Sequence, residues 1–90
     1  MKTLEKRMKA LDKRIMKLGK SLEGRLDVHL IESALDYIHH AERLLAFEIL
    51  CTYVEDFDIR LTEQESQEVS FIDKEFRTES TLDYPIKSTG

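Results

Sequence analysis

Apolar residues in the first quarter of the chain recur in alternating steps of four and three positions. The residues in this pattern are Leu4, Met8, Leu11, Ile15, Leu18 and Leu22. The spacing is the a/d pattern of a heptad repeat and predicts a helix with a narrow apolar seam. A seam of this kind on a small domain needs a mate. We therefore expect it either to form a homodimer or to fold back onto the rest of the chain, with Gly24 ending the helix.

Two further helices are indicated by apolar residues at helical spacing. The second is expected to begin near Asp27, which can cap it, and its apolar face comprises Leu30, Ile31, Ala34, Leu35 and Ile38. His39 and His40 end this pattern, so we expect a tight turn there. The third helix is expected from about Glu42 to Phe57. The residues that should face the core from it are Leu45, Ile49, Leu50, Tyr53, Val54 and Phe57.

The segment DFDIRLTEQE interrupts the helical pattern. Ile59 and Leu61 alternate with polar residues, which predicts an extended connector with two side chains turned inward. Thr62 and Glu65 then form a T-x-x-E capping box, a signature of a new helix start. The apolar stripe of this last helix comprises Val69, Ile72 and Phe76. Beyond Arg77 the chain is polar and contains the single Pro, so we expect a frayed tail.

These elements predict an all-α fold, a small bundle of three to four helices with an N-terminal heptad-patterned helix. Three Gly, one Pro and 36% charged residues are typical of a helical chain, and 90 residues leave room for one core only. We expect a single helical domain over residues 1–77, with a basic helix at 1–24, an acidic body at 26–77 and a tail at 78–90.

Charge is distributed unevenly along the chain. Residues 1–25 carry nine Lys/Arg and three Asp/Glu, a net +6, whereas residues 26–90 carry five Lys/Arg and fifteen Asp/Glu, a net −10. Such asymmetry concerns partners and association rates rather than the fold. The basic segment has no aromatic residue for base stacking, and its seam already has an explanation in packing. We therefore expect neither nucleic acid nor a membrane surface as a partner.

Residues that could carry catalysis or bind a metal are few and scattered. No H-E-x-x-H motif, Cys/His pair or Gly-rich phosphate loop is present. Asp36 and His40 are four positions apart and are interpreted as a surface pair on one helix face. Cys51 has no activating base at helical spacing, so a packed core thiol is the favoured interpretation. We expect no enzymatic activity, no cofactor and no metal.

The composition of the chain also bears on its compartment. No apolar run approaches the roughly 20 residues that span a bilayer. No uninterrupted apolar stretch of a signal peptide follows the basic N-terminus. A single Cys excludes an intramolecular disulfide framework and fits a reducing compartment. We expect a soluble, cytoplasmic protein.

Acidic residues gather around the junction between the third and fourth helices. The set comprises Glu48, Glu55, Asp56, Asp58, Glu63, Glu65 and Glu68. Acids in the first turn of the new helix are favourable there, but Glu55, Asp56 and Asp58 lie at or beyond a helix C-terminus, where negative charge is mildly unfavourable. Two interpretations stay open. The acids form a solvated face, or they dock onto a basic partner, for instance by imitating a phosphate backbone.

Part of this sequence resembles the MafI family of bacterial immunity proteins. The resemblance covers about residues 18–76 and is most specific in A-E-x-L-L-A-F-E-I-L-C, followed after a helical spacer by E-D-F-D-I-R-L-T-E-Q-E. Family members often have Gly–Glu where this chain has Ala41–Glu42. The resemblance implies a protein that binds and neutralises a cognate secreted toxin domain, often a nuclease, and so protects the producing cell. The alternative is a non-enzymatic adaptor that dimerises through the seam at residues 4–22.

Overall fold

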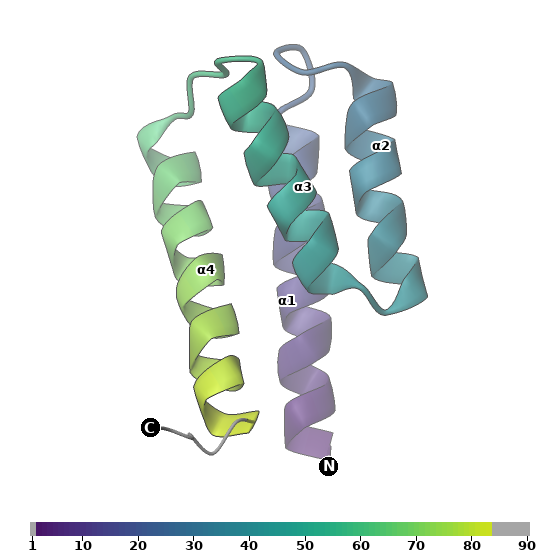
Figure 1. Ribbon diagram of the computed structural model, residues 1–90, viewed down its shortest axis with the longest axis vertical. Helices are drawn as coiled ribbons and strands as arrows, with labels where there is room; N and C mark the ends of the chain where they lie inside the picture. The colour runs from purple at the N-terminus through teal and green to yellow at the C-terminus, as the bar shows by residue number, and fades with distance from the viewer. Residues whose placement is uncertain (1, 84–90) are drawn as a thin grey trace.

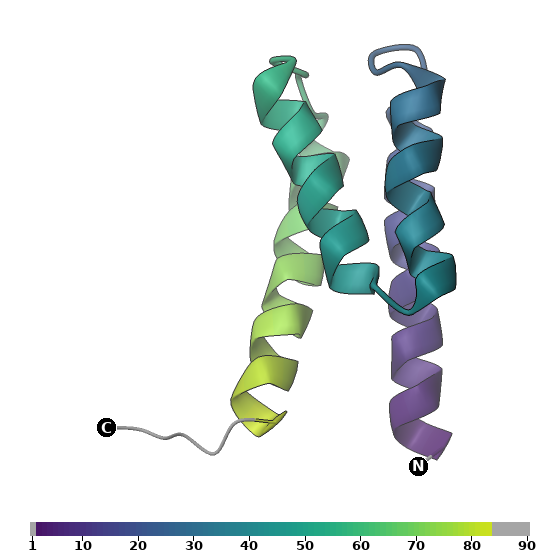
Figure 2. The same ribbon diagram turned by 45° about the vertical axis from the view of Figure 1, so that its right-hand side comes forward.

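The computed structural model describes residues 2–83, and the side chains of residues 6–78. Its helices run alternately up and down, so neighbours in sequence are antiparallel (Figures 1 and 2). The elements are α1 (Lys2–Ser21), α2 (Val28–Asp36), the 3-10 helix η1 (Tyr37–His40), α3 (Arg43–Asp56) and α4 (Glu63–Asp83). The prediction of a small all-α bundle is therefore confirmed.

The heptad seam of α1 folds back onto the body of the protein. Leu11, Ile15, Leu18 and Leu22 are all buried, and α1 packs against α2, α3 and α4. Met8 is half-buried, and the side chain of Leu4 lies outside the described residues. The seam thus has its mate within the same chain, and these four residues form core rather than an exposed dimer surface.

The passage from α1 to α2 depends on two glycines. A Cβ at Gly19 would lie 3.1 Å from both terminal carbons of Leu35, so glycine lets the two helices approach closely. α1 ends at Ser21, three residues before the predicted stop, and Gly24 makes the turn with a φ of +93°. Asp27 caps α2 as predicted, because its Oδ1 accepts a hydrogen bond of 2.8 Å from the backbone N–H of His29.

A left-handed residue also closes the turn between η1 and α3. Ala41 has a φ of 60°. Its N–H donates to the carbonyl of Ile38 at 3.1 Å, and the N–H of Glu42 donates to the carbonyl of Tyr37 at 2.9 Å. This pair of bonds is the Schellman pattern that ends many helices, usually with glycine in the left-handed position. The predicted turn at His39 and His40 therefore lies where expected, but it is completed by a non-glycine residue.

The core-facing side of α3 differs from the prediction. Ala46, Phe47 and Leu50 are buried, whereas Leu45 is 37% exposed and Phe57 is 55% exposed. The assignment of these last two residues to the core was wrong. α3 carries apolar residues on more than one side, so periodicity alone does not single out one face. Other predicted core residues of this helix, Ile49, Tyr53 and Val54, are half-buried against the core.

α4 packs through the predicted stripe and is also tied to α1 by charge. Ile72 is buried, Val69 and Phe76 pack against the core, and the Phe76 ring lies 5.7 Å from that of Phe47. The helix continues past Arg77 to Asp83, into the segment expected to fray, and residues 84–90 lie outside the described residues. Its ion pairs with α1 and the α1–α2 loop are Arg7–Glu75 at 3.4 Å, Arg14–Glu68 at 2.8 Å and Arg25–Glu65 at 2.6 Å.

Candidate partner-binding surface

The corner between α3 and α4 begins with a Schellman motif at the end of α3. The N–H of Asp58 donates to the carbonyl of Glu55 at 3.2 Å, and the N–H of Ile59 donates to the carbonyl of Val54 at 2.9 Å. Ile59 and Val54 both pack against the core, which supplies the apolar contact that accompanies this motif. The chain therefore turns sharply after Phe57 and then runs extended, with Ile59 and Leu61 turned inward as predicted.

Asp58 occupies the left-handed position of this motif. Its φ is 55°, a conformation that glycine or asparagine adopts more readily. Its carboxylate also adds negative charge at the negative end of the α3 dipole. Aspartate tolerates this backbone conformation better than most L-residues, but its charge is unfavourable at this end of α3. Local electrostatics therefore give no reason for a charged residue here.

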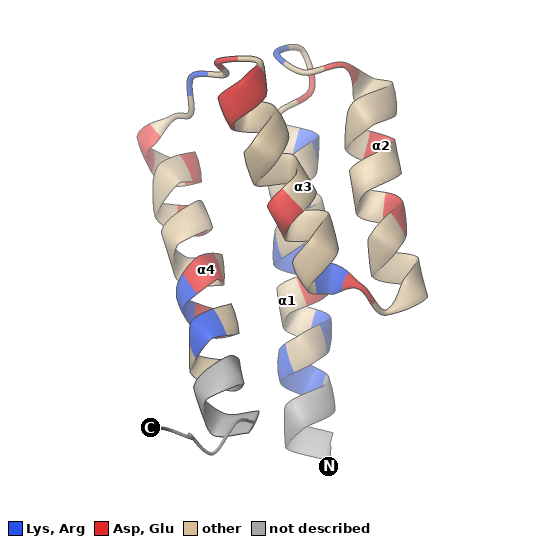
Figure 3. Ribbon diagram, viewed as in Figure 1, with Lys and Arg blue, Asp and Glu red and all other residues tan. Residues whose placement is uncertain are grey.

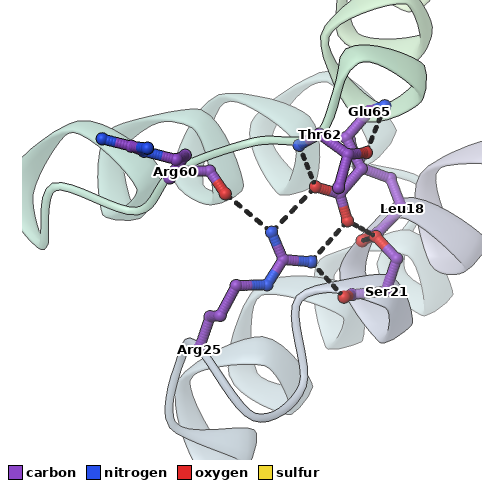
Figure 4. Close-up of polar contacts among 6 residues, drawn as sticks. All are labelled: Leu18, Ser21, Arg25, Arg60, Thr62 and Glu65. Atoms are coloured by element: carbon purple, nitrogen blue, oxygen red, sulfur yellow. Dashed lines mark hydrogen bonds and ion pairs between the residues drawn. The ribbon is translucent and has the colours of Figure 1, made fainter.

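Behind this corner, Glu65 ties three segments of the chain together (Figure 4). Its carboxylate accepts bonds from Arg25 Nη1 at 2.9 Å and Nη2 at 2.6 Å, and from Ser21 Oγ at 2.7 Å. The predicted capping box is also present: the N–H of Thr62 donates to Glu65 Oε1 at 2.8 Å, and the N–H of Glu65 donates to Thr62 Oγ1 at 3.1 Å. Arg25 further donates to the Arg60 carbonyl at 2.7 Å, so the loop between α1 and α2 also fixes the connector between α3 and α4.

These contacts keep Glu65 ionised. The hydrogen bond from Arg25 is the largest influence, and together with bonds from Thr62 and Ser21 it outweighs burial and lowers the pKa of Glu65 from its usual 4.5 to about 2. Glu65 is only 8% exposed. Its predicted place among the partner-binding acids was therefore wrong: a carboxylate whose lone pairs are taken by an arginine, a serine and a backbone amide is structural.

The other predicted acids divide by position. Glu68 faces α1 and is half-buried in its pair with Arg14. Glu48 is exposed about two turns before the corner on α3. The remaining acids are exposed, surround the connector and form no ion pair with another described residue; they are Glu55, Asp56, Asp58 and Glu63. Figure 3 shows this acidic end of the bundle, where α3 meets α4. We call these four residues the acidic corner.

An exposed aromatic ring lies within the acidic corner, although its residue was predicted to face the core. Phe57 stands between Asp56 and Asp58 in the chain and is 55% exposed. Its ring centroid lies 6.1 Å from that of Tyr53, at an interplanar angle of 58°. Its acidic neighbours in the sequence are not a sufficient signal, because Leu26 also lies between two ionised residues and is buried. An exposed ring rimmed by charge has the composition of an interface centre.

The residues considered for catalysis or metal binding stay apart in the structure. Asp36 and His40 form the predicted surface pair, with 3.8 Å between carboxylate oxygen and ring nitrogen. Cys51 is half-buried and lines an apolar cavity of about 220 Å³ between α1, α3 and α4. Burial, followed by the charges of Asp73, Glu55 and Glu48, raises the pKa of the Cys51 thiol to about 11. Among residues 6–78 no three His, Cys, Asp or Glu side chains are arranged to hold a metal ion.

Comparisons of the chain with family models, with curated proteins and with solved structures found no match. Within the described part of the chain, no helix is both long enough and apolar enough to cross a membrane.

Proposed function

We propose that this protein is an immunity protein that neutralises a cognate bacterial toxin domain by stoichiometric binding. The toxin domain would be basic at the contact surface, as a nuclease is at its substrate-binding cleft. The acidic corner would be the surface that meets it. Neutralisation by occupancy requires no chemistry from the inhibitor, only a rigid surface of complementary charge and shape.

The observation that carries this proposal is an exposed Phe57 ring set among four exposed acids that form no ion pair with another described residue. Exposed charges of one sign accelerate encounter with a surface of the opposite sign. A buried aromatic side chain supplies much of the binding energy once two surfaces are in contact. The corner contains both, and the Glu65–Arg25 contacts hold the connector in place beneath it. Among the large apolar side chains that the structure describes, Phe57 is the most exposed, at 55%.

The resemblance to the MafI family adds support from two turns. The most specific shared segment, E-D-F-D-I-R-L-T-E-Q-E, is the acidic corner together with the capping box. At the other turn, family members often have glycine where this chain has Ala41. Ala41 has a left-handed φ of 60°, the conformation that favours glycine. The chain therefore differs from the family pattern only in the residue at position 41, whose left-handed backbone conformation is the one that the family's glycine favours.

The alternative of a coiled-coil adaptor has less support. It requires residues 4–22 to offer an apolar seam to a second chain. In this structure the seam residues from Leu11 to Leu22 are buried by the other helices of the same chain. Dimerisation through this seam would require α1 to leave the bundle and expose the core.

The test is co-expression with a candidate toxin domain encoded beside the gene, followed by binding kinetics on the purified pair. Wild type should restore growth. The triple variant Glu55→Gln, Asp56→Asn, Asp58→Asn should associate about tenfold more slowly at low salt, and the gap should shrink as salt screens the charges. Phe57→Ala should instead accelerate dissociation, because it removes the anchor and leaves the charge intact.

A matched control removes three exposed acids elsewhere. Glu23→Gln, Glu32→Gln and Asp36→Asn change the net charge by the same amount on the α1–α2 loop and on α2. This control variant should associate with the toxin at close to the wild-type rate. Equal association rates for the two triple variants would show that the acidic corner is only a solvated face. Failure of wild type to restore growth would show that the tested toxin is not the partner.

A further inference from the structure

The packing of α1 accounts for its leucines and arginines but not for its lysines. Its apolar seam is buried, and Arg7 and Arg14 pair with acids of α4. Five lysines on the same helix are exposed and form no ion pair with a described residue; they are Lys6, Lys9, Lys13, Lys17 and Lys20. We call these five residues the lysine stripe.

The lysine stripe follows one line along the helix. Its members are separated by three, four, four and three positions, a spacing that keeps side chains on one face. At 1.5 Å per residue the stripe is about 21 Å long. With 100° of rotation per residue, Lys13 lies about 160° around the helix from the buried Ile15, so the stripe lies on the side of α1 opposite the seam. Lys13 and Lys17 also border the groove between α1 and α4, which Glu68 lines from the other side. Figure 3 shows the basic residues distributed along α1.

Charges on α1 are sorted by direction. Arg7 and Arg14 lie on the flank that faces α4, and Arg14 also stacks over the Phe71 ring at 4.1 Å. Asp12 lies on the opposite flank and pairs with Arg43 of α3 at 2.5 Å. Residues 6–21 contain no other acid, so no carboxylate from this segment interrupts the stripe. Solubility is served equally well by interspersed signs, and does not call for a stripe of one sign on a chain of net charge −4.

We propose that the lysine stripe binds the phosphate backbone of nucleic acid without reading its sequence. Ammonium groups on long side chains bind phosphate as point charges and impose no fixed geometry. The stripe contains no Arg, Asn, Gln or aromatic side chain to contact a base edge or stack on a base. Contacts restricted to the backbone position a protein but carry no sequence information.

A lipid surface fits the same charges less well. Helices that lie on membranes bury an apolar face between the headgroups and the acyl chains. The apolar face of α1 is already buried against α2, α3 and α4. The outward face therefore offers charge alone. The proposal departs from the sequence-based expectation of no nucleic-acid partner, because packing explains the seam but not the five lysines, which form no ion pair with a described residue.

The proposal is independent of the toxin-binding function, since it rests on α1 and not on the acidic corner. Binding should be weak and strongly dependent on salt. If all five lysines contact phosphates, the logarithm of the binding constant should fall against the logarithm of salt concentration with a slope of about −4.5. A dissociation constant of about 10⁻⁴ to 10⁻⁶ M is typical of such non-specific binding.

The test is fluorescence anisotropy of two labelled DNA duplexes of unrelated sequence, titrated with the full-length protein at several salt concentrations. We expect equal affinities for the two duplexes and a steep salt slope. Replacing the five lysines by glutamine should abolish binding, whereas replacing them by arginine should retain it, because arginine keeps the charge. Lys74→Gln, an exposed lysine on α4, is the control and should leave affinity and slope unchanged.

Several results would overturn the proposal. One is the absence of binding to either duplex at low salt, and another is the same affinity in the five-glutamine variant as in wild type. Binding to phosphatidylserine vesicles but not to duplex would assign the stripe to a lipid surface instead. Circular dichroism checks that the variants are folded. If the five-glutamine variant does not fold, Lys13→Gln and Lys17→Gln singly should each reduce the slope by about 1, and unchanged slopes would refute the proposal.

Discussion

At the scale of single residues, Glu65 holds the acidic corner in place. It completes the capping box with Thr62 and accepts both guanidinium branches of Arg25. The same carboxylate therefore starts α4 and connects it to the loop between α1 and α2. Hydrogen bonds to an ionised, buried acceptor stabilise a fold more than exposed pairs do. Arg7 and Arg14 pair with their α4 partners in more exposed settings and should contribute less.

Replacing Glu65 by glutamine should lower the free energy of unfolding at pH 7 by about 2 kcal/mol, because the charge-assisted bonds are lost. The loss should depend on pH. The pKa of Glu65 is depressed in the folded state, from 4.5 to about 2, so its stabilisation is present above pH 4.5 and is lost as the pH falls towards 2. Urea titrations between pH 7 and pH 2 should therefore show wild type and Glu65→Gln converging.

Glu32→Gln is the control for this prediction, since Glu32 is exposed on α2. Its free energy of unfolding should stay close to that of wild type across the range. A constant difference between wild type and Glu65→Gln down to pH 2 would show that the side-chain amide, and not the loss of charge, causes the destabilisation.

At the scale of elements, η1 and α3 end with the same motif. Each closes with a Schellman pattern whose left-handed residue is not glycine: Ala41 after η1 and Asp58 after α3. A left-handed L-residue costs about 1–2 kcal/mol relative to a right-handed one. Asp58 has a candidate reason in the acidic corner. Ala41 has no polar side chain and therefore no comparable reason.

Ala41→Gly should raise the free energy of unfolding by about 0.5–1 kcal/mol. Relief of the left-handed strain exceeds the greater backbone entropy that glycine has in the unfolded chain. Ala10→Gly is the matched control: Ala10 is exposed within α1, where glycine lowers stability by about 1 kcal/mol. Opposite signs for the two substitutions in denaturant titrations are the expected result. A loss of stability at both positions would show that the turn at Ala41 does not require the left-handed conformation.

At the scale of the whole molecule, α1 is the helix that completes the core. It contacts all three other α-helices, and its seam residues are buried among them. The basic helix is therefore an integral part of the bundle and not an appended arm. The three sides of α1 outside the seam have different uses: arginines hold α4, Asp12 holds α3, and lysines are exposed.

Ile15→Asp tests this arrangement. Ile15 is 0% exposed, so the substitution places an unpaired carboxylate in the core and should cost at least about 4 kcal/mol, enough to unfold a domain of this size. Circular dichroism should show loss of the cooperative melt, whereas Ala10→Asp on the exposed face should keep a cooperative melt, lowered only by the poorer helix propensity of Asp, about 0.7 kcal/mol. If the seam instead joined two chains, Ile15→Asp would give a folded, helical monomer by light scattering.

Local features of this chain were predictable from its sequence because they depend on neighbours in the chain. The Asp27 cap, the Thr62–Glu65 capping box and the inward turn of Ile59 and Leu61 involve residues within a few positions of one another. Backbone conformation, capping and side-chain periodicity act over this range. The acidic junction after α3 was predictable for the same reason, because its acids are close together in the sequence.

The tertiary structure decided which of these residues are available to a partner. Arg25 and Glu65 are 40 positions apart, and no local pattern pairs them, yet their contact removes Glu65 from the acidic surface. Leu45 is exposed because α3 turns other residues, Ala46 and Phe47 among them, towards the core. Phe57 follows the buried Leu50 by seven positions, on the same side of the helix, and is exposed because it is the C-cap at the very end of α3. A helix with apolar side chains on several sides can pack through any of them, so the choice depends on the shapes of α1, α2 and α4 around it. The sequence by itself determined the elements and their ends; only their packing determined which charges are paired, and which ring and which lysines face the solvent.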